Sequence, residues 1–300
     1  MHLATSTDND LMKVWEGLGY YRRARNMLIS ARKVVDKYNG IFPNQYDQIL
    51  ALDGVGPYTA AAIASFAFNQ PYVVVDGNVV RLISRLLGIV DPVEENRTRQ
   101  IIQQQAEYLL DVENPGIFNQ AIMDFGSQQC RPANPDCNKC PLSQQCVAYR
   151  SDLVKMIPVK KAKKPKRIRH FYYLVPVKGD FIYIRRRDEG DIWPQLYEFY
   201  LVETNNHVGW EEILKSIDLP IIESQTKPRK YKQLLSHQVI QAEFLTVALR
   251  DDGAILHRDK YTAIKTKKIR KFAFPKVIDC FLKDKDVILN LEKFNIRHGE

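Results

Sequence analysis

The chain has 300 residues, of which 45% are hydrophobic and 26% are charged, a balance that excludes a disordered chain and suffices for two domains. No run approaches the ~18 continuous apolar residues of a membrane span, and the first ten residues lack the basic and apolar regions of a secretory signal. The formal net charge of +9 favours a polyanionic partner such as nucleic acid, with a merely soluble basic protein as the alternative.

The first half of the chain is predicted to be all-α. Apolar residues recur at helical spacing as far as about Ala148, and almost no alternating strand pattern interrupts them. The predicted helical segments are Leu11–Leu18, Arg22–Tyr38, Tyr46–Leu52, Thr59–Phe68, Gly77–Gly88 and Glu94–Val112.

The second half is predicted to be α+β. The segment Lys160–Arg169 contains seven Lys or Arg and no acid, which predicts an exposed linker, either a solvated hinge or a contact for nucleic-acid phosphates. Alternating patterns and a Lys178–Asp180 turn then predict the strands Phe171–Val177, Phe181–Arg185, Tyr197–Val202 and Ala242–Leu249. Helical patterns follow at Trp210–Ile217 and Pro275–Lys283.

A glycine turn joins two of the predicted helices. In Leu52–Thr59, Gly54 and Gly56 flank Val55 and are followed by a proline, a pattern that exposes backbone N–H groups at a helix N-terminus. Such groups suit a phosphate oxygen. By itself the turn is a weak signal, and an ordinary helix connection is the alternative.

A single acid, Asp76, follows the apolar run Val73–Val75 and precedes a predicted helix. Taken alone, Asp76 is typical of a helix N-cap. Beside a hairpin of two helices the same carboxylate suits a second role, because breaking an N-glycosidic bond develops positive charge on the sugar and a carboxylate stabilises that charge.

Four of the five cysteines crowd into one short segment. Their spacing is Cys130-x6-Cys137-x2-Cys140-x5-Cys146. Thiolates at such spacing bind zinc or an iron–sulfur cluster, and the spacing alone barely separates the two metals. The odd total also fits a reducing cytoplasm better than a disulfide framework, and Cys280, in an apolar helix pattern, is expected to be a structural core thiol.

The hairpin, the acid and the four cysteines, in this order, resemble the helix-hairpin-helix DNA glycosylases from about Leu11 to Tyr149. The endonuclease III and MutY branches of that superfamily carry a four-cysteine [4Fe–4S] loop of this spacing. The resemblance implies an all-α helix-hairpin-helix glycosylase domain over residues 1–129 and a [4Fe–4S] cluster loop over 130–149. A basic linker over 150–169 and an α+β Nudix-like domain over 170–300 are expected to follow.

Position 58 distinguishes the two branches. The lyase branch has a lysine there that attacks the sugar through a Schiff base, which Tyr58 cannot form, so endonuclease III-like lyase activity is the weaker alternative. Trp15–Asn26 is similar to the MutY segment that enters the duplex near the oxidised guanine. Tyr20 is the expected wedge, with packing at a helix end as the alternative. The segment Phe118–Gly126 also matches the MutY branch.

The second half resembles the Nudix-like domain that MutY proteins carry after the cluster. Arg185–Arg187 and Trp193–Phe199 match its early hairpin region, and Leu235, Ser236 and His237 align with the Phe-Ser-His loop that reads 8-oxoguanine. Leu235 replaces the family's phenylalanine, whereas the hydrogen-bonding groups of Ser236 and His237 are retained. No Glu-rich helix of the pyrophosphate-hydrolysing kind is present in the sequence, so this half is expected to bind a lesion without hydrolysing nucleotides.

The resemblance implies a base-excision repair enzyme that flips adenine out of a pair with 8-oxoguanine or guanine in double-stranded DNA and hydrolyses its N-glycosidic bond. Asp76 is expected to stabilise the sugar cation, with support from Tyr58 and Asn78. Contacts to the DNA backbone are expected from Gly54, Val55, Gly56, Arg131 and Lys139. The protein is expected to be a monomer without membrane contact, in the bacterial cytoplasm and associated with the nucleoid.

In the family, the general-acid glutamate lies in a stretch that precedes the segment matching Asp10–Trp15. Glu16 does not replace it, because Glu16 belongs to the Trp-Glu-Gly-Leu-Gly segment. Loss of a positioned general acid costs ~10²–10⁴ in rate. The alternative to an active enzyme is therefore a catalytically inactive lesion-binding fragment or the product of a mis-started gene.

Overall fold

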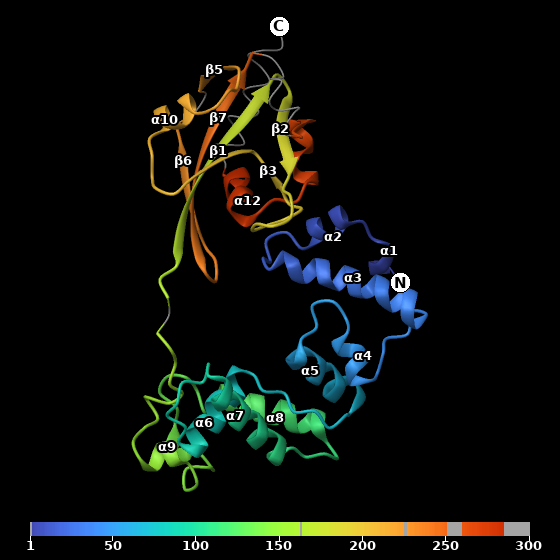
Figure 1. Cartoon of the computed structure of the whole chain (residues 1–300), viewed down its shortest axis with the longest axis vertical. Helices are drawn as coiled ribbons and strands as arrows, with labels where there is room; N and C mark the ends of the chain where they lie inside the picture. The colour runs from blue at the N-terminus through green and yellow to red at the C-terminus, as the bar shows by residue number, and fades with distance from the viewer. Residues whose placement is uncertain (1, 163, 225–226, 251–259, 285–300) are drawn as a thin grey trace. The chain divides into compact units, whose positions relative to one another are not determined.

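The computed structural model describes residues 2–162, 164–224, 227–250 and 260–284, and it divides into two compact units (Figure 1). The first unit is helical and comprises the described residues of Ile29–Lys164. The second unit combines His2–Leu28 with the described residues that follow Pro165. In the described part of the chain, no helix has both the length and the apolar character needed to cross a membrane.

The helical unit is built from short helices that have identifiable ends. α5 begins with Pro57 in its first turn and ends at Asn69 in the left-handed conformation; α6 ends at Gly88, which has φ +69°. The elements, with α3 shared between the units, are α3 (Tyr21–Tyr38), α4 (Tyr46–Leu50), α5 (Pro57–Phe68), α6 (Gly77–Leu87), α7 (Asn96–Leu109), α8 (Pro115–Gln128), η1 (Cys137–Lys139) and α9 (Val147–Arg150).

Two small apolar cores hold this unit together. Ile49 of α4 packs on Ala60 and Ala64 of α5, where small side chains allow the two helices of the hairpin to approach closely. Ile83 of α6 packs in a second core with Ile102 of α7. All five side chains are buried, so the segment that leads into α6 rests on a rigid base.

The second unit is organised around one mixed sheet. β1 and β7 pair in parallel along most of their length, from Arg167 opposite Gln238 to Val177 opposite Ala248, and the other neighbours are antiparallel. The strands are β1 (Arg167–Lys178), β2 (Phe181–Arg186), β3 (Tyr197–Glu198), β4 (Tyr200–Thr204), β5 (Ile221–Ser224), β6 (Arg229–Leu234), β7 (Gln238–Leu249) and β8 (Thr262–Lys265).

Each face of this sheet is covered by a helix. Alternate residues of β1 point to opposite faces, as strand geometry requires, so Phe171 and Tyr172 belong to different cores. The core that contains Phe171 also contains side chains of α12 (Lys276–Lys283) and of the 3₁₀ helix η2 (Thr266–Lys271). The core that contains Tyr172 is covered by α10 (Trp210–Lys215).

The N-terminal helices α1 (His2–Thr5) and α2 (Asp8–Val14) and the start of α3 belong to this second unit. Met12, Tyr21 and Ala24 are buried in the core on the α12 face, where Phe274 and Ile278 also lie. This differs from the expected assignment of residues 1–129 to a single helical domain. The reason is physical: these apolar side chains find their buried surface on the sheet unit.

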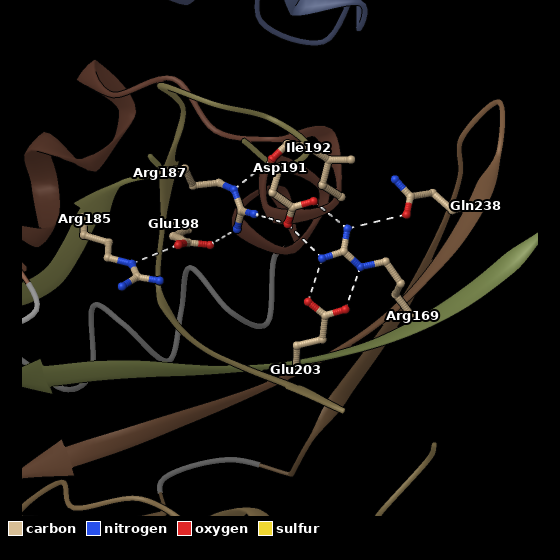
Figure 2. A network of polar contacts seen from close by, with 8 residues as sticks. All are labelled: Arg169, Arg185, Arg187, Asp191, Ile192, Glu198, Glu203 and Gln238. Atoms are coloured by element: carbon tan, nitrogen blue, oxygen red, sulfur yellow. Dashed lines mark hydrogen bonds and ion pairs between the residues drawn. The ribbon is translucent and has the colours of Figure 1, made fainter. Parts of the chain in front are cut away.

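Charged side chains form a continuous network on the same unit, in which Arg169, Arg187 and Glu198 are buried and Asp191 and Glu203 are exposed (Figure 2). Arg169 donates two hydrogen bonds to Glu203, each of 2.6 Å, and two to Asp191, of 2.7 and 2.8 Å. Arg187 contacts both Asp191 and Glu198. The hydrogen bonds from Arg169 hold the pKa of the Asp191 carboxyl below its usual range. The network thereby ties β1, β2 and β4 to the connection before β3.

The predicted fold class is confirmed, with an all-α part followed by an α+β part. The predicted hairpin at Lys178–Asp180 is also present, since Val177 pairs with Ile182. Several details were wrong or missed. The predicted helix Leu11–Leu18 ends at Val14, and the predicted strand Tyr197–Val202 is divided at Phe199 into β3 and β4. The helix α8, the Lys- and Arg-rich strand β6 and the strands β5 and β8 were not among the predicted elements. Cys280, expected in the core, is exposed. The tail beyond Lys283 lies outside the described residues except for Asp284.

Candidate active site and four-cysteine loop

The predicted glycine turn is the hairpin between α4 and α5. Gly54 has φ +78°, a left-handed conformation that favours glycine, and Gly56 is the N-cap of α5. Neither glycine donates its amide to an acceptor among the described residues. Lys33 of α3 braces the turn by an ion pair of 3.3 Å with Asp53. The hairpin therefore presents free N–H groups at a helix N-terminus, which is a geometry that suits an anionic oxygen.

Asp76 is the N-cap of α6. Its Oδ1 accepts hydrogen bonds from the backbone N–H groups of Asn78 and Val79, both of 2.8 Å. Its Oδ2 accepts the side-chain amide of Asn78 at 2.7 Å. The N-cap alternative is confirmed as geometry, and it does not exclude a second role. Three donors fix the direction of a half-buried carboxylate at the start of a helix.

A buried arginine links this carboxylate to the four-cysteine loop, Cys130–Cys146. Arg81 of α6 donates to the side-chain oxygen of Asn78 at 3.0 Å and to the carbonyl of Cys130 at 2.7 Å. Its side chain also reaches the carbonyl of Gly126. Burial lowers the pKa of Arg81, but a guanidinium remains charged. One side chain thus connects Asp76, through Asn78, with the end of α8 and the first cysteine.

Two residues of α8 position the segment around Asp76. Asn119 is fully buried; its Oδ1 accepts the N–H of Val74 at 2.9 Å, and its Nδ2 donates to the carbonyl of Tyr72 at 2.9 Å. Gly126 lies so close to α6 that a Cβ added there would be 2.9 Å from the backbone oxygen of Asn78. Both residues fall in the predicted segment Phe118–Gly126. The hydrogen bonds explain the asparagine at position 119, and the close approach to α6 explains the glycine at position 126.

The four predicted cysteines line one small cavity, of about 30 Å³. Cys137 lies in η1 and Cys146 is the N-cap of α9. The other walls are largely apolar and include Leu82, Phe125 and Leu142. Burial, together with the neighbouring thiols, raises the pKa of Cys137 and of Cys140. A bound positive centre would remove that penalty, because thiolates are the metal-binding form.

The donor set therefore fits a thiolate-bound group, and the shared cavity is the observation that carries this conclusion. The fit is one of donor chemistry and not of coordination geometry, because among the described residues no group of three or more His, Cys, Asp or Glu is arranged to hold a metal ion. Arg85 of α6 braces the loop from inside: it donates to the carbonyls of Arg131 at 2.8 Å and Pro132 at 3.2 Å, and to the sulfur of Cys130 at 3.4 Å.

The remaining predicted residues are exposed. Tyr58, in the first turn of α5, is 49% exposed and makes no hydrogen bond to Asp76 among the described contacts. Lys139, on the four-cysteine loop, is also exposed and pairs with Asp136 at 3.5 Å, while Arg131 donates to the carbonyl of Asn134. The structure thus joins Asp76 and Asn78 by a hydrogen bond, and no described hydrogen bond joins Tyr58 to either of them.

The residues expected to read a lesion lie on the second unit. Tyr20 is 77% exposed with φ +50°, directly after Gly19, and the indole of Trp15 donates to the Gly19 carbonyl. Ser236 and His237 are exposed at the connection between β6 and β7. Leu235 instead packs partly against the core.

Comparison with known proteins finds a family match in the first part of the chain. Residues 2–107 match the model of the HhH-GPD superfamily base excision DNA repair protein. The chain is similar to this superfamily over these residues. The family match begins at residue 2, although residues 2–28 pack on the sheet unit, so the domain boundaries stay a prediction.

Two relatives of this chain are named adenine DNA glycosylase. One, from Buchnera aphidicola subsp. Baizongia pistaciae, is 28% identical over 99% of this chain and 82% of its own length. Another, from Buchnera aphidicola subsp. Schizaphis graminum, is 32% identical over 76% of this chain and 65% of its own length. A solved thermostable thymine-DNA glycosylase aligns with 32% identity over 50% of this chain and 69% of that chain, at a TM-score of 0.46.

Sequence reasoning missed three residues of this site. Arg81, Arg85 and Asn119 are all buried, and each satisfies several backbone carbonyls or amides. A signal existed for the two arginines, because they lie four residues apart in an otherwise apolar helix, where an unpaired charge would be costly. Their partners could not be foreseen, since those carbonyls are 45 to 72 residues away along the chain.

Proposed function

We propose that this chain binds double-stranded DNA and removes adenine that is paired with 8-oxoguanine or guanine, by hydrolysis of the N-glycosidic bond. The observation that carries the proposal is the oriented carboxylate of Asp76, held by three N–H donors at the start of α6. The relatives named adenine DNA glycosylase support adenine as the base that is removed. On this proposal the protein acts on the bacterial chromosome.

The chemistry assigned to the site begins with extrusion of the adenosine from the stack, since the bond cannot be reached within the duplex. As the bond breaks, positive charge develops on the sugar, and the Asp76 carboxylate stabilises it. Asn78 keeps that carboxylate oriented, and Tyr58 supports the leaving base. The free amides of Gly54 and Gly56 hold a backbone phosphate.

The leaving adenine must also be protonated. Glu16 is unsuited to this step, because its carboxylate accepts the amide of Phe274 at 3.2 Å and pairs with Lys13 within the second unit. No residue of the described part of the chain is therefore proposed to protonate the leaving adenine. This is the point at which a catalytically inactive lesion-binding protein would differ from an enzyme.

We further propose that the four cysteines hold a [4Fe–4S] cluster. When bound, such a cluster would supply a rigid cross-link between α8, η1 and α9 and would not take part in the hydrolysis. Arg131 and Lys139 project from this loop and would then face the DNA backbone. Ser236 and His237 would hydrogen-bond the oxidised guanine.

The decisive experiment is single-turnover release of adenine from a duplex with one A:8-oxoguanine pair, using the 300-residue chain and its Asp76→Asn variant. Asparagine caps helices about as well as aspartate, so the variant should stay folded. We expect release by the parent and a loss of ~10²–10³ in the variant, the range for removal of one electrostatic stabiliser.

Two other results would speak against the enzyme. Lesion-selective binding with no release would leave a recognition protein. Trapping of the chain on abasic DNA by borohydride would indicate a lyase, which the tyrosine at position 58 argues against.

A further inference from the structure

Lysines without an ion pair to a described residue lie on the second unit, in the segment that follows β7. Residues 260–278 contain seven Lys or Arg and no Asp or Glu. This one segment therefore carries a charge of +7, against +9 for the whole chain. So large a one-sign surplus in a short folded segment is typical of a surface that meets a polyanion.

The 3₁₀ helix η2 arranges these charges. A 3₁₀ helix has three residues per turn, so residues three apart lie above one another. Ile269 is buried in the core and anchors one edge of η2. Lys268 and Lys271 consequently share an exposed edge, and both are exposed in the structure. The buried Ile269 thus fixes the edge of η2 on which Lys268 and Lys271 lie.

The cations of η2 differ in whether they already have partners. Arg270 donates to the carbonyl of Leu282 and pairs with Asp279 at 3.5 Å. Lys267, Lys268 and Lys271 form no ion pair with a described residue. We define these three lysines as the η2 strip. Arg270 holds the local structure, whereas the η2 strip is left with its charge unsatisfied.

The η2 strip lies next to the segment that presents Tyr20. The two residues bonded to that segment, Phe272 and Phe274, follow directly after η2. The carbonyl of Phe272 accepts the Lys13 ammonium at 3.4 Å, and the carbonyl of Phe274 accepts the hydroxyl of Tyr21 at 3.3 Å. These contacts and the buried Met12 fix α2 and the start of α3 on this unit, so the same compact unit carries both Tyr20 and the η2 strip.

We propose that the η2 strip binds the phosphate backbone of the duplex into which Tyr20 inserts. This inference rests on the proposed function, because it takes the ligand to be double-stranded DNA. Lysine ammonium groups contact phosphates without reading bases, so the strip contributes affinity and register and no lesion specificity. It adds a DNA-binding element to the sheet unit that is separate from Ser236 and His237.

The test is the salt dependence of DNA binding by the full chain. Lys268→Ala/Lys271→Ala is compared with the parent, all in an Asp76→Asn background that prevents turnover. Each phosphate neutralised by a protein cation contributes ~0.9 to the magnitude of the slope of log K against log salt. The slope of the double variant should therefore be smaller by about 1.8. The affinity ratio between A:8-oxoguanine and undamaged duplexes should stay the same.

Two further double variants control the charge and the fold. Lys215→Ala/Lys227→Ala removes the same charge from the unit, and α10, which carries Lys215, covers the opposite face of the sheet. This variant should keep the parental slope. Lys268→Arg/Lys271→Arg retains the cations and should also keep it. Equal thermal midpoints for all variants would show that folding is unchanged.

The outcomes separate this inference from the proposed function. Lesion-preferring binding with an unchanged slope in Lys268→Ala/Lys271→Ala overturns the η2 strip alone. A slope that falls equally in the Lys215→Ala/Lys227→Ala control also overturns it, because the effect would then be general charge. A parent that binds no DNA at all would remove both the strip and the proposed function.

Discussion

The close approach of α8 to α6 at Gly126 gives a prediction that can be worked from the structure. Replacing Gly126 with alanine would place a Cβ 2.9 Å from both the Cβ and the backbone oxygen of Asn78. A backbone atom cannot rotate away as a side chain can, so the two helices must separate. Asn78 would move with α6, and with it the amide that orients Asp76.

Two effects of opposite sign determine how much Gly126→Ala changes the free energy of unfolding. Overpacking of this kind costs ~1–3 kcal/mol, whereas alanine is better than glycine inside a helix by ~1 kcal/mol. We therefore expect Gly126→Ala to lower the free energy of unfolding by up to ~2 kcal/mol. Gly77→Ala is the matched control, because Gly77 is also helical and a Cβ there would meet no atom within 4 Å.

Urea unfolding followed by far-ultraviolet circular dichroism measures the stability of both variants, and single-turnover adenine release measures the effect on Asp76. Gly126→Ala should be less stable than Gly77→Ala and should release adenine more slowly than the parent. Equal unfolding free energies for the two variants would refute the packing argument. A destabilised Gly126→Ala with the parental rate would refute the link from α8 through Asn78 to the carboxylate.

Three other expectations concern a buried amide, the cysteines and an exposed carboxylate. Asn119→Ala should destabilise the helical unit by about 3 kcal/mol in urea unfolding, because the N–H of Val74 and the carbonyl of Tyr72 would lose their partner at ~1–3 kcal/mol each; stability equal to the parent would contradict this. Cys140→Ser should abolish iron content and visible absorbance of the purified chain, while Cys280→Ser, outside the cavity, should retain both. The pKa of Asp191 is lowered by its hydrogen bonds with Arg169, so its contribution to stability is present above ~3.9, the unfolded value, and is lost as pH falls through the folded pKa; acid unfolding followed by near-ultraviolet circular dichroism should shift in Asp191→Asn, and an unchanged profile would oppose the assignment.

The elements that could be predicted from the sequence are those with local causes. The apolar spacing of α3, α5 and α6 and the turn before β2 are encoded within a few residues, and the structure has them close to the predicted bounds. Asp76 was identified because a single acid follows an apolar run. The four-cysteine loop was identified because thiols so close together have few other uses.

What could not be predicted depends on contacts between distant residues. β6 has a polar sequence, Arg-Lys-Tyr-Lys-Gln-Leu, and becomes a strand because it pairs with β7 along its whole length. Asn119 gives no local sign that it will serve Val74, 45 residues earlier. The packing of Met12 and Tyr21 against the sheet unit also depends on distant contacts. Nothing in the sequence of residues 8–25 indicates a partner near residue 274.

That last contact has a consequence for synthesis of the protein. Tyr21 and its acceptor Phe274 are 253 residues apart. At a translation rate of ~5–20 residues per second, roughly 13–50 s pass between their emergence from the ribosome. During this interval the core that buries Met12 and Tyr21 lacks Phe274, Ile278 and the other side chains from the C-terminal part of the chain. Nascent chains stalled before residue 272 should therefore bind chaperones through their N-terminal helices, and completed chains should release them.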